Sequence, residues 1–538
     1  GRDRGIIGEL SMRKAFTALA VAAAVVASGG FAEAKTFKWG FQTDTTSLDP
    51  HAHNVTFTLG FLGNIYEGLV RRGPDLQFEP ALATSWENVE PTRWRFHLRK
   101  GVKFHDGGDF NADDVLFSYE RTNNEDANLR GRVVGITEVI KVDDYTVDFV
   151  TEKPNPIIYY EWDTWFMMDK EWSEANGAAT PTNMSKGVES YAAHHENGTG
   201  AFTITERQVD VKTVMVPFKG WWDKPVHNLT EVIMTPIGQD ATRVAALLSG
   251  EVDMVYPVPV QDIGRVEKND GTSVLVGPEL RTIFLFMDQF RDELLYSSVK
   301  GKNPFKDLKV RQAMYHAIDI EAIKKKIMRG LSDPSALMIS PKLFDRSEGF
   351  TRLPYDRDKA KALLAEAGYP DGFETRMDCP NDRYVNDEQI CQAIVSMLAK
   401  VGIKSTLVAQ PKAKYFAAIA PKGGSDYSFG LLGWTPSSFD SWNVLFNIIG
   451  SPKPKEGRGL YNYSGYSNAE VDALADEVAI ETDKEKRDAL IEKAFKIAAD
   501  EVAFIPLHQQ ALAWGKRDNI DLKQRADNQF RFYYVNVK

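Results

Sequence analysis

The pattern of polar and apolar residues changes twice along this chain, and these changes limit the folds that it can adopt. From Lys35 to about residue 288 most segments alternate polar and apolar residues, which is typical of β-hairpins. From there to about residue 505 apolar residues recur at helical spacing between short buried strands, as in α/β units. The remaining segment returns to strand pattern, in IPLHQQALAWG and FRFYYVNVK. The backbone is therefore expected to cross twice between two units, the wiring of hinged proteins that close on a ligand.

Length and charge fit this division and exclude some partners. With 538 residues the chain is too long for one compact core, so we expect two or three domains. Its formal charge of −10 is spread along the sequence and leaves no basic patch. We therefore expect no nucleic-acid partner and no polybasic membrane anchor.

The N-terminal segment has the features of an export signal. Arg13 and Lys14 precede an apolar run from Ala15 to Ala27, and Ala32-Glu33-Ala34 is an A-x-A cleavage site. The alternative is a membrane anchor, but the run is shorter than the about 20 residues needed to span a bilayer. We expect that residues 1–34 are removed and that the exported protein is soluble.

The two cysteines, Cys379 and Cys391, lie close together in DCPNDRYVNDEQIC. Because an exported protein matures in an oxidising compartment, we expect them to form a disulfide. The alternative is two buried free thiols. A metal site is not expected, since two cysteines without a histidine between them do not complete a coordination sphere.

Several helix ends can be predicted from local capping residues. FNADDVLFSYERT is expected to begin a helix at the cap Asn111. Ser467 with Glu470, and Thr482 with Glu485, have the spacing of capping boxes. LKVRQAMYHAIDIEAIKKKIMRG, at residues 308–330, is expected to form one helix that stops at a glycine.

A search for catalytic motifs finds none. G-x-S-x-G, H-E-x-x-H and G-x-x-x-x-G-K-[ST] are all absent. His194-His195-Glu196 contains metal-ligand types, but adjacent histidines on an irregular loop point apart, and we expect a polar surface segment. We predict that the protein is not an enzyme and has no cofactor and no metal site.

One long segment carries a family resemblance. ALATSWENVEPTRWRFHLRKGVKFHDGGDFNADDVLFSYER, from Ala81 to Arg121, resembles the signature of the dipeptide/oligopeptide/nickel class (family 5) of solute-binding proteins of ABC importers. Further matches follow in the family's order: EGLVRR, KVDDYTVDFV, GTGAFTI, GWWD, LLSGEVDMV, VRQAMYHAID, KALLAEAGYPDGF and IPLHQQ. The resemblance covers nearly everything after Lys35.

The resemblance implies an α/β, two-lobed periplasmic binding protein fold of the Venus-flytrap type, with two hinge crossovers. Lobe I would comprise residues 35–281 and 506–538, with an extra β-rich subdomain at about 77–195. Lobe II would comprise 282–505. A monomer would engulf a small solute in the periplasm and deliver it to an inner-membrane ABC permease and ATPase.

The same resemblance points to a loop of the binding site. In peptide-binding members a G-W-x-x-D loop supplies a carboxylate for the ligand's ammonium. Here Gly433 and Trp434 match, but Ser437 stands where the aspartate is expected. Asp440 is one candidate substitute; a role as turn acceptor or helix cap is the alternative.

Other binding residues follow from position and residue type. Arg383 lies where dipeptide-binding relatives hold the ligand's carboxylate, and a guanidinium pairs both carboxylate oxygens; a surface arginine is the alternative. Three aromatic residues are candidates for pocket walls: Tyr384, Trp434 and Trp442. Thr56 is a candidate contact from lobe I.

Four functional hypotheses remain. The first is capture of short peptides for import. The second keeps the fold but binds an oligosaccharide, an opine or a metal chelate, because the expected acid is missing at Ser437. The third is a secreted hydrolase, and the fourth is a signalling receptor without an importer.

Overall fold

The computed structural model describes residues 33–538. The predicted signal peptide up to Ala32 falls outside this part, which begins within the predicted cleavage motif at Glu33. In residues 33–538 none of the helices combines the length and apolar character needed to cross a membrane.

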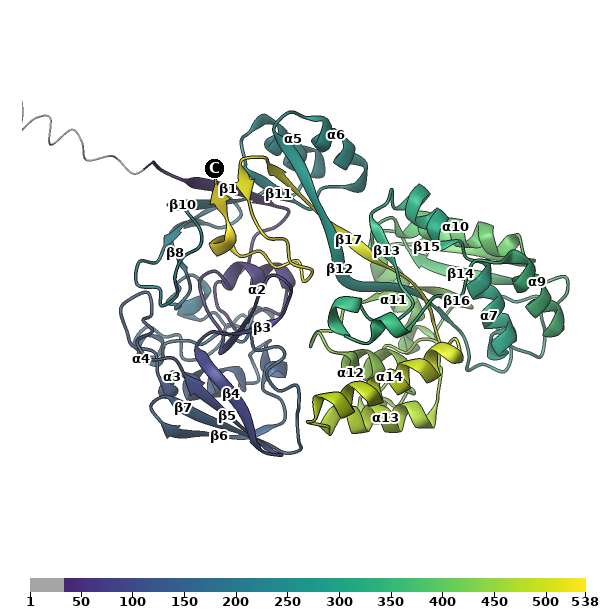
Figure 1. Ribbon diagram of the computed structural model, residues 1–538, viewed down its shortest axis with the longest axis horizontal. Coiled ribbons are helices and arrows are strands. Elements are labelled where there is room, and N and C mark those ends of the chain that lie inside the picture. Colours follow the sequence, from purple (N-terminus) through teal and green to yellow (C-terminus); the bar gives the residue numbers. More distant parts are fainter. Residues whose placement is uncertain (1–32) are drawn as a thin grey trace, which may run out of the picture.

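One mixed sheet of eleven strands extends through the molecule (Figure 1). Its strands follow the order β15-β14-β16-β12-β17-β11-β1-β10-β9-β8, and β13 pairs with β17. The strands are β1 (Thr36–Phe41), β8 (Phe202–Gln208), β9 (Lys212–Pro217), β10 (Glu231–Pro236), β11 (Met254–Tyr256), β12 (Thr272–Met287), β13 (Ser332–Pro334), β14 (Phe373–Pro380), β15 (Ile403–Gln410), β16 (Phe429–Trp434) and β17 (Ile505–Arg517).

The two longest strands, β12 and β17, run side by side between the two halves of the molecule (Figure 1). At one end β11 pairs with β17, and at the other end β16 pairs with β12. Their ladder is regular up to Pro278–Ala511 and resumes at Thr282–Gln509. The shift leaves more residues on β12 than on β17, a bulge that interrupts the ladder and bends the strand. We propose that the hinge lies at this bulge; the predicted lobe boundaries at 281/282 and 505/506 remain a prediction.

The C-terminal segment packs into the core of the first half. Trp39 of β1 is fully buried, and its ring centroid lies 5.3 Å from that of Phe530 and 5.2 Å from that of Phe532. Helix α2 (Thr56–Leu62) and Tyr256 belong to the same core. The returning tail therefore rejoins the N-terminal half, as its strand pattern indicated.

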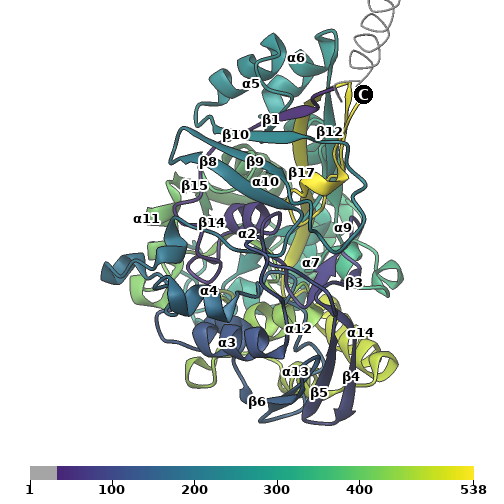
Figure 2. The ribbon, with the colours of Figure 1, turned by 90° about the vertical axis from the view of Figure 1, so that its left-hand side faces the viewer.

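A smaller sheet with the order β4-β5-β7-β6 lies at the end of the molecule opposite α5 and α6 (Figure 2). Its strands are β4 (Ala83–Glu90), β5 (Arg93–Leu98), β6 (Ile136–Asp143) and β7 (Thr146–Thr151). There are also two sheets of two strands each: β2 (Val70–Arg72) pairs with β3 (Phe78–Pro80), and β18 (Ile520–Asp521) pairs with β19 (Asn536–Val537). Helix α3 (Ala112–Thr122) packs beside the four-stranded sheet and starts at the predicted cap, Asn111, whose side chain accepts from the N–H of Asp113.

Helices cover both faces of the large sheet in the second half. The second half contains α7 (Leu308–Ala317), α8 (Ile320–Ala322), α9 (Arg357–Glu366), α10 (Asp387–Ala399), α11 (Lys412–Ile419), α12 (Ser441–Val444), α13 (Ala469–Ile480) and α14 (Lys484–Asp500). Besides α2 and α3, the N-terminal half contains α4 (Lys170–Ala175), α5 (Asp240–Ser249) and α6 (Ile263–Lys268). Strands β14 and β15 are parallel and joined by α10, which buries Ile390, Ile394 and Leu398. The disulfide between Cys379 and Cys391 is confirmed and ties β14 to α10.

Three predicted helix ends are wrong. The helix expected over 308–330 ends at Ala317, because Ile318 is extended and Asp319 caps a new turn. Helix α13 is capped by Asn468, since the Ser467 hydroxyl bonds Ser451 instead. Helix α14 is capped by Asp483, one residue after the predicted cap.

Candidate functional site

A cavity of about 420 Å³ lies beside the crossing strands and is lined from both halves of the molecule. We call it the hinge cavity. Its polar and aromatic lining includes Gln42 and Tyr256 from the N-terminal half, Asn528 from the C-terminal segment that packs into that half, Arg383 and Asn386 from the second half, and Glu279, Gln510 and Trp514 from β12 and β17. A ligand here would contact both lobes and the bulge that joins them.

The hinge cavity carries one cation and one anion. Arg383 is exposed, and its backbone N–H donates to the Asp387 carboxylate at 2.9 Å, which fixes its loop. Gln510 donates to Glu279 Oε2 at 2.6 Å and accepts from the N–H of Val385 at 3.3 Å. This amide thus connects the acid on β12 to the loop that carries the arginine.

The start of the G-W loop packs against the same segment. The Tyr384 hydroxyl donates to the Gly433 carbonyl at 3.4 Å, and burial raises the pKa of Tyr384, which keeps it a neutral donor. A Cβ atom on Gly433 would lie 2.6 Å from Tyr384 Cε1 and 3.1 Å from Arg281 Cδ. Only glycine fits this approach. The structure therefore brings Tyr384 and Gly433 together, with Arg281 as a neighbour that sequence reasoning missed.

The remainder of the loop, residues 434–443, is held by one amide side chain. Asn443 accepts from Trp434 Nε1 at 2.9 Å and donates to the Ser437 hydroxyl at 3.2 Å. The Ser437 side chain is exposed, and its position offers no charge. Within the described residues, Thr435 Oγ1, Ser438 Oγ and Trp442 Nε1 are buried without a hydrogen-bond partner.

The Asp440 side chain caps helix α12, and its carboxylate is not free to bind a ligand. Its carboxylate accepts from the N–H of Trp442 at 2.9 Å at the start of α12. Both oxygens also bind the Arg487 guanidinium, at 2.7 and 2.8 Å, and the two side chains are 8 and 7 % exposed. Burial opposes the charge of Arg487, but the hydrogen bonds and attraction of Asp440 outweigh it and raise its pKa. The negative charge of Asp440 is already neutralised, which argues against the anchor role.

A second cavity, of about 490 Å³, lies where the loop faces the small sheet. We call it the far cavity. Ser437, Trp442 and Ala479 line it from the second half, and Arg132, Ile158 and Glu161 line it from the N-terminal half. Thr56 lines neither cavity; its side chain is exposed at the start of α2, two residues after Asn54, which accepts from Arg132 Nη2 at 3.1 Å.

The two halves also touch directly through Phe439. This residue has a left-handed backbone, with φ of 52°, and its ring lies 4.9 Å from the Arg72 guanidinium. Phe78 covers that guanidinium at 4.0 Å. The nearby carbonyls of Leu76 and Tyr160 accept its N–H groups at 2.9 and 2.6 Å. Through Phe439, the loop of the second half therefore packs against Arg72 of the N-terminal half.

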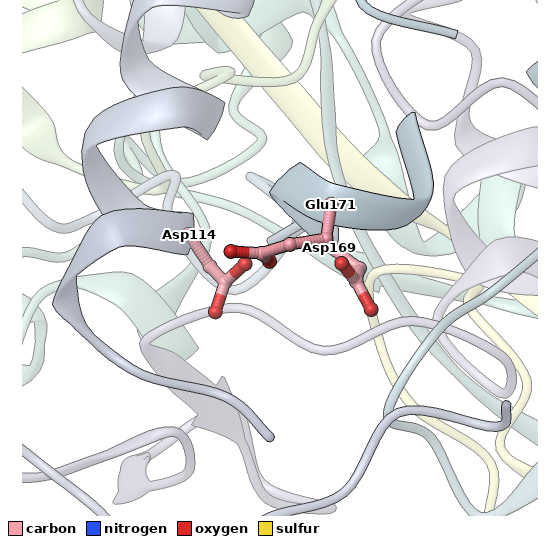
Figure 3. Close-up of side chains that lie close together, drawn as sticks. All are labelled: Asp114, Asp169 and Glu171. Atoms are coloured by element: carbon pink, nitrogen blue, oxygen red, sulfur yellow. The ribbon is translucent and has the colours of Figure 1, made fainter. Parts of the chain in front are cut away.

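Asp114, Asp169 and Glu171 form an acidic cluster between α3 and α4 (Figure 3). Asp114 accepts from the backbone N–H groups of Asn111 and Lys170, and Asp169 accepts from that of Trp172. Burial raises the pKa of Asp114 to about 7, and these hydrogen bonds offset only part of the effect. Asp169 caps α4 and Asp114 completes the capping box of α3, so backbone N–H groups already bind oxygens of both carboxylates.

A family comparison decides what kind of protein carries these cavities. Residues 77–455 match the model of bacterial extracellular solute-binding proteins, family 5 (middle region). The chain belongs to this family. Family 5 solute-binding proteins deliver small solutes to the permease and ATPase of ABC transporters, and the expected resemblance is confirmed.

Related proteins and solved structures agree with this assignment. The glutathione-binding protein GsiB of Shigella flexneri is 26 % identical over 521 residues, which cover 94 % of this chain and 95 % of that protein. HbpA2 of Haemophilus parasuis superposes with a TM-score of 0.80 at 24 % identity, over 94 % of this chain and 100 % of that one. DppA of Helicobacter pylori, in complex with the peptide STSA, gives a TM-score of 0.70 at 24 % identity, over 93 % and 98 %.

These comparisons confirm the two-lobed α/β fold and rule out the hydrolase hypothesis, because the relatives of this family 5 protein are solute-binding proteins and not enzymes. Sequence reasoning missed three residues of the hinge cavity and its border: Glu279, Arg281 and Gln510. Glu279 and Arg281 lie where β12 and β17 shift register, and no local pattern in the sequence marks that shift.

Proposed function

We propose that this solute-binding protein captures a short peptide, or a peptide-like solute with a free carboxylate, in the hinge cavity. The supporting observation is that Arg383 and Glu279, of opposite charge, line one cavity that both lobes and both crossing strands enclose. A zwitterion placed between them would contact groups that move relative to each other when the hinge bends.

The residue types suit the two ends of a peptide. The planar guanidinium of Arg383 pairs both oxygens of a carboxylate. Glu279, whose Oε1 lies 3.8 Å from Arg281 Nη1 in a looser pair than that of Asp440 with Arg487, offers a carboxylate to an ammonium or amide N–H group, in place of the acid missing at Ser437. This matters because a buried charge without a counter-charge costs several kcal/mol. The relative named as glutathione-binding is in keeping with a peptide ligand.

Arg281 favours a second candidate, an opine-type or other anionic solute without a free ammonium. Its guanidinium lies 5.9 Å from the Tyr384 ring, and its side chain packs against Gly433. This places a cation beside the loop that carries an acid in peptide-binding members. Replacing Glu279 by Gln separates the candidates, because only a solute with an ammonium group should bind more weakly.

Mass spectrometry of the solute released by denaturing the purified protein identifies the ligand class. We then expect Arg383→Ala to weaken binding of that solute at least tenfold in calorimetry, or about 1.4 kcal/mol. Arg357, an exposed residue at the start of α9, provides the matched control as Arg357→Ala. Unchanged affinity in Arg383→Ala would remove this residue from the site.

We also propose that the protein acts in the periplasm, after cleavage behind Ala34. The family of extracellular binding proteins and the n-region, apolar run and A-x-A motif support this location. Mass spectrometry of the protein exported by its host tests the cleavage. The measured mass should be that of a chain that begins at Lys35.

A further inference from the structure

We infer that a separate cavity within the second half is a binding site for an uncharged aromatic molecule that is not the solute of the hinge cavity. Its volume is about 310 Å³, and it lies between α14 and the irregular segment of residues 336–353, which we call the strap. We call it the strap cavity. None of its lining residues also lines the hinge cavity or the far cavity. A molecule bound here would therefore not occupy the space of the solute.

The strap is fixed on both sides of the part that lines the cavity. All of its residues are described, and apart from two 3-10 turns they form no regular element. On one side Arg346 donates to Glu492 Oε2 of α14 at 2.7 Å. On the other side Arg352 donates to the carbonyl of Ser335 at 2.7 Å and to that of Pro506 at the start of β17. Residues 349–351, which line the cavity, are held between these anchors, so the strap does not collapse into the space below it.

The walls of the strap cavity are apolar and rich in rings. Four aromatic side chains line it: Tyr315, Phe350, Phe495 and Phe504. Phe495 and Phe504 are 2 and 5 % exposed, so the cavity reaches into the core of the second half. Ala498 of α14 adds a small side chain that leaves room between the rings.

This size and this lining favour a ring as the occupant. Protein interiors are otherwise close-packed, with few voids larger than a water molecule. An apolar cavity of about 150 Å³ stays dry and binds benzene, so the strap cavity has room for a bicyclic ring. Aromatic walls favour an aromatic ligand, because rings attract each other in edge-to-face and offset-stacked arrangements.

The charged groups of the lining leave no demand for an ion. Glu492, Lys496 and Asp500 all belong to α14 and are 42, 69 and 65 % exposed, which places them at the mouth of the cavity. Glu492 is paired with Arg346, and Lys496 donates to Asp500 at 2.9 Å. A charged ligand would lose its hydration without gaining a free counter-charge, whereas an uncharged ring with one N–H or hydroxyl group directs that group to the mouth.

Calorimetry with indole as the probe tests this inference, because indole is uncharged, bicyclic and carries one N–H group. Ala499 is exposed on α14 and lines the strap cavity, so Ala499→Trp fills it from the mouth. Ala489 is exposed on the same helix outside the lining, and Ala489→Trp is the matched control. If Ala499→Trp unfolds, Ala336→Trp fills the cavity from the strap.

We expect the wild type to bind indole with a Kd of about 1 mM or lower, and the filled variant to bind it at least about tenfold more weakly. Ala489→Trp should keep the wild-type Kd. Saturating indole should not compete with the solute recovered from the native protein, and Arg383→Ala should leave indole binding unchanged. The last result keeps this test independent of the proposed function.

Three results would overturn the inference. The first is the absence of indole binding by the wild type up to the solubility limit of indole. The second is an unchanged Kd in a folded filled variant. The third is competition between indole and the solute, which would place indole in the hinge cavity.

Discussion

The ion pair between Asp440 and Arg487 allows the structural and the ligand-binding interpretations of Asp440 to be separated by one substitution. Asp440→Asn keeps the helix cap, because asparagine caps as well as aspartate. It removes the charge opposite Arg487, which lies at 2.7 and 2.8 Å and is 7 % exposed. Breaking a buried pair by removing one partner costs about 3–5 kcal/mol, because the other charge stays buried.

The expected effect is large enough to measure by calorimetry. For a unit the size of the second lobe, each kcal/mol shifts Tm by about 2–4 °C, so we expect a decrease of roughly 6–20 °C. Asp483→Asn is the matched control, since Asp483 is an exposed cap of α14 and should change Tm little. Arg487→Met completes a double-mutant cycle. The decrease in the free energy of unfolding of the double variant should be smaller, by at least about 2 kcal/mol, than the sum of the decreases in the two single variants.

The opposite result would refute this reasoning. If Asp440→Asn leaves Tm unchanged but weakens binding of the native solute tenfold or more, the carboxylate faces the ligand and not Arg487. Solute titration of each folded variant by calorimetry distinguishes these outcomes.

Three further predictions concern the loop, the disulfide and the acidic cluster. Ser437→Asp adds an exposed acid outside the hinge cavity, where Glu279 already serves the ammonium, and should change the Kd of free-amine peptides less than about twofold; binding tightened about fivefold or more would place the ammonium at the loop instead. Replacing Cys379 and Cys391 by Ala should lower the free energy of unfolding by about 3 kcal/mol in urea titrations, because their short loop is no longer closed; an unchanged midpoint would contradict this. The pKa of Asp114, about 7 in the folded protein, exceeds its unfolded value near 4. The stabilisation from its protonated form is therefore complete below about pH 4 and lost as the pH rises through 7, so Tm should fall less between pH 5 and pH 8 in Asp114→Asn than in the wild type.

Features that depend on neighbouring residues were predicted well. The cap at Asn111 needs only the first turn of α3, and the disulfide needs only two nearby cysteines in an oxidising compartment. The two crossovers followed from the period of the apolar residues, because strand and helix periods differ. Caps failed where adjacent candidates compete: Ser467 and Asn468 are both capping types, and a tertiary bond to Ser451 decides between them.

Features that depend on register or on distant segments were not predictable. Glu279 lines the hinge cavity because β12 and β17 shift register there, and no local pattern reveals that shift. The partner of Asp440 is 47 residues away in the chain. The family motif pointed to the loop at residues 433–443, but only the packing shows that Tyr384 contacts Gly433 while Ser437 and Trp442 line a separate cavity.

Small-angle X-ray scattering tests the central claim that the two lobes close on a solute about the bulge in β12. The radius of gyration is measured for the solute-free protein, after addition of the solute recovered from the native protein, and again after its removal. We expect the radius to decrease on binding and to return on removal. An unchanged radius at solute concentrations that saturate binding in calorimetry would contradict closure.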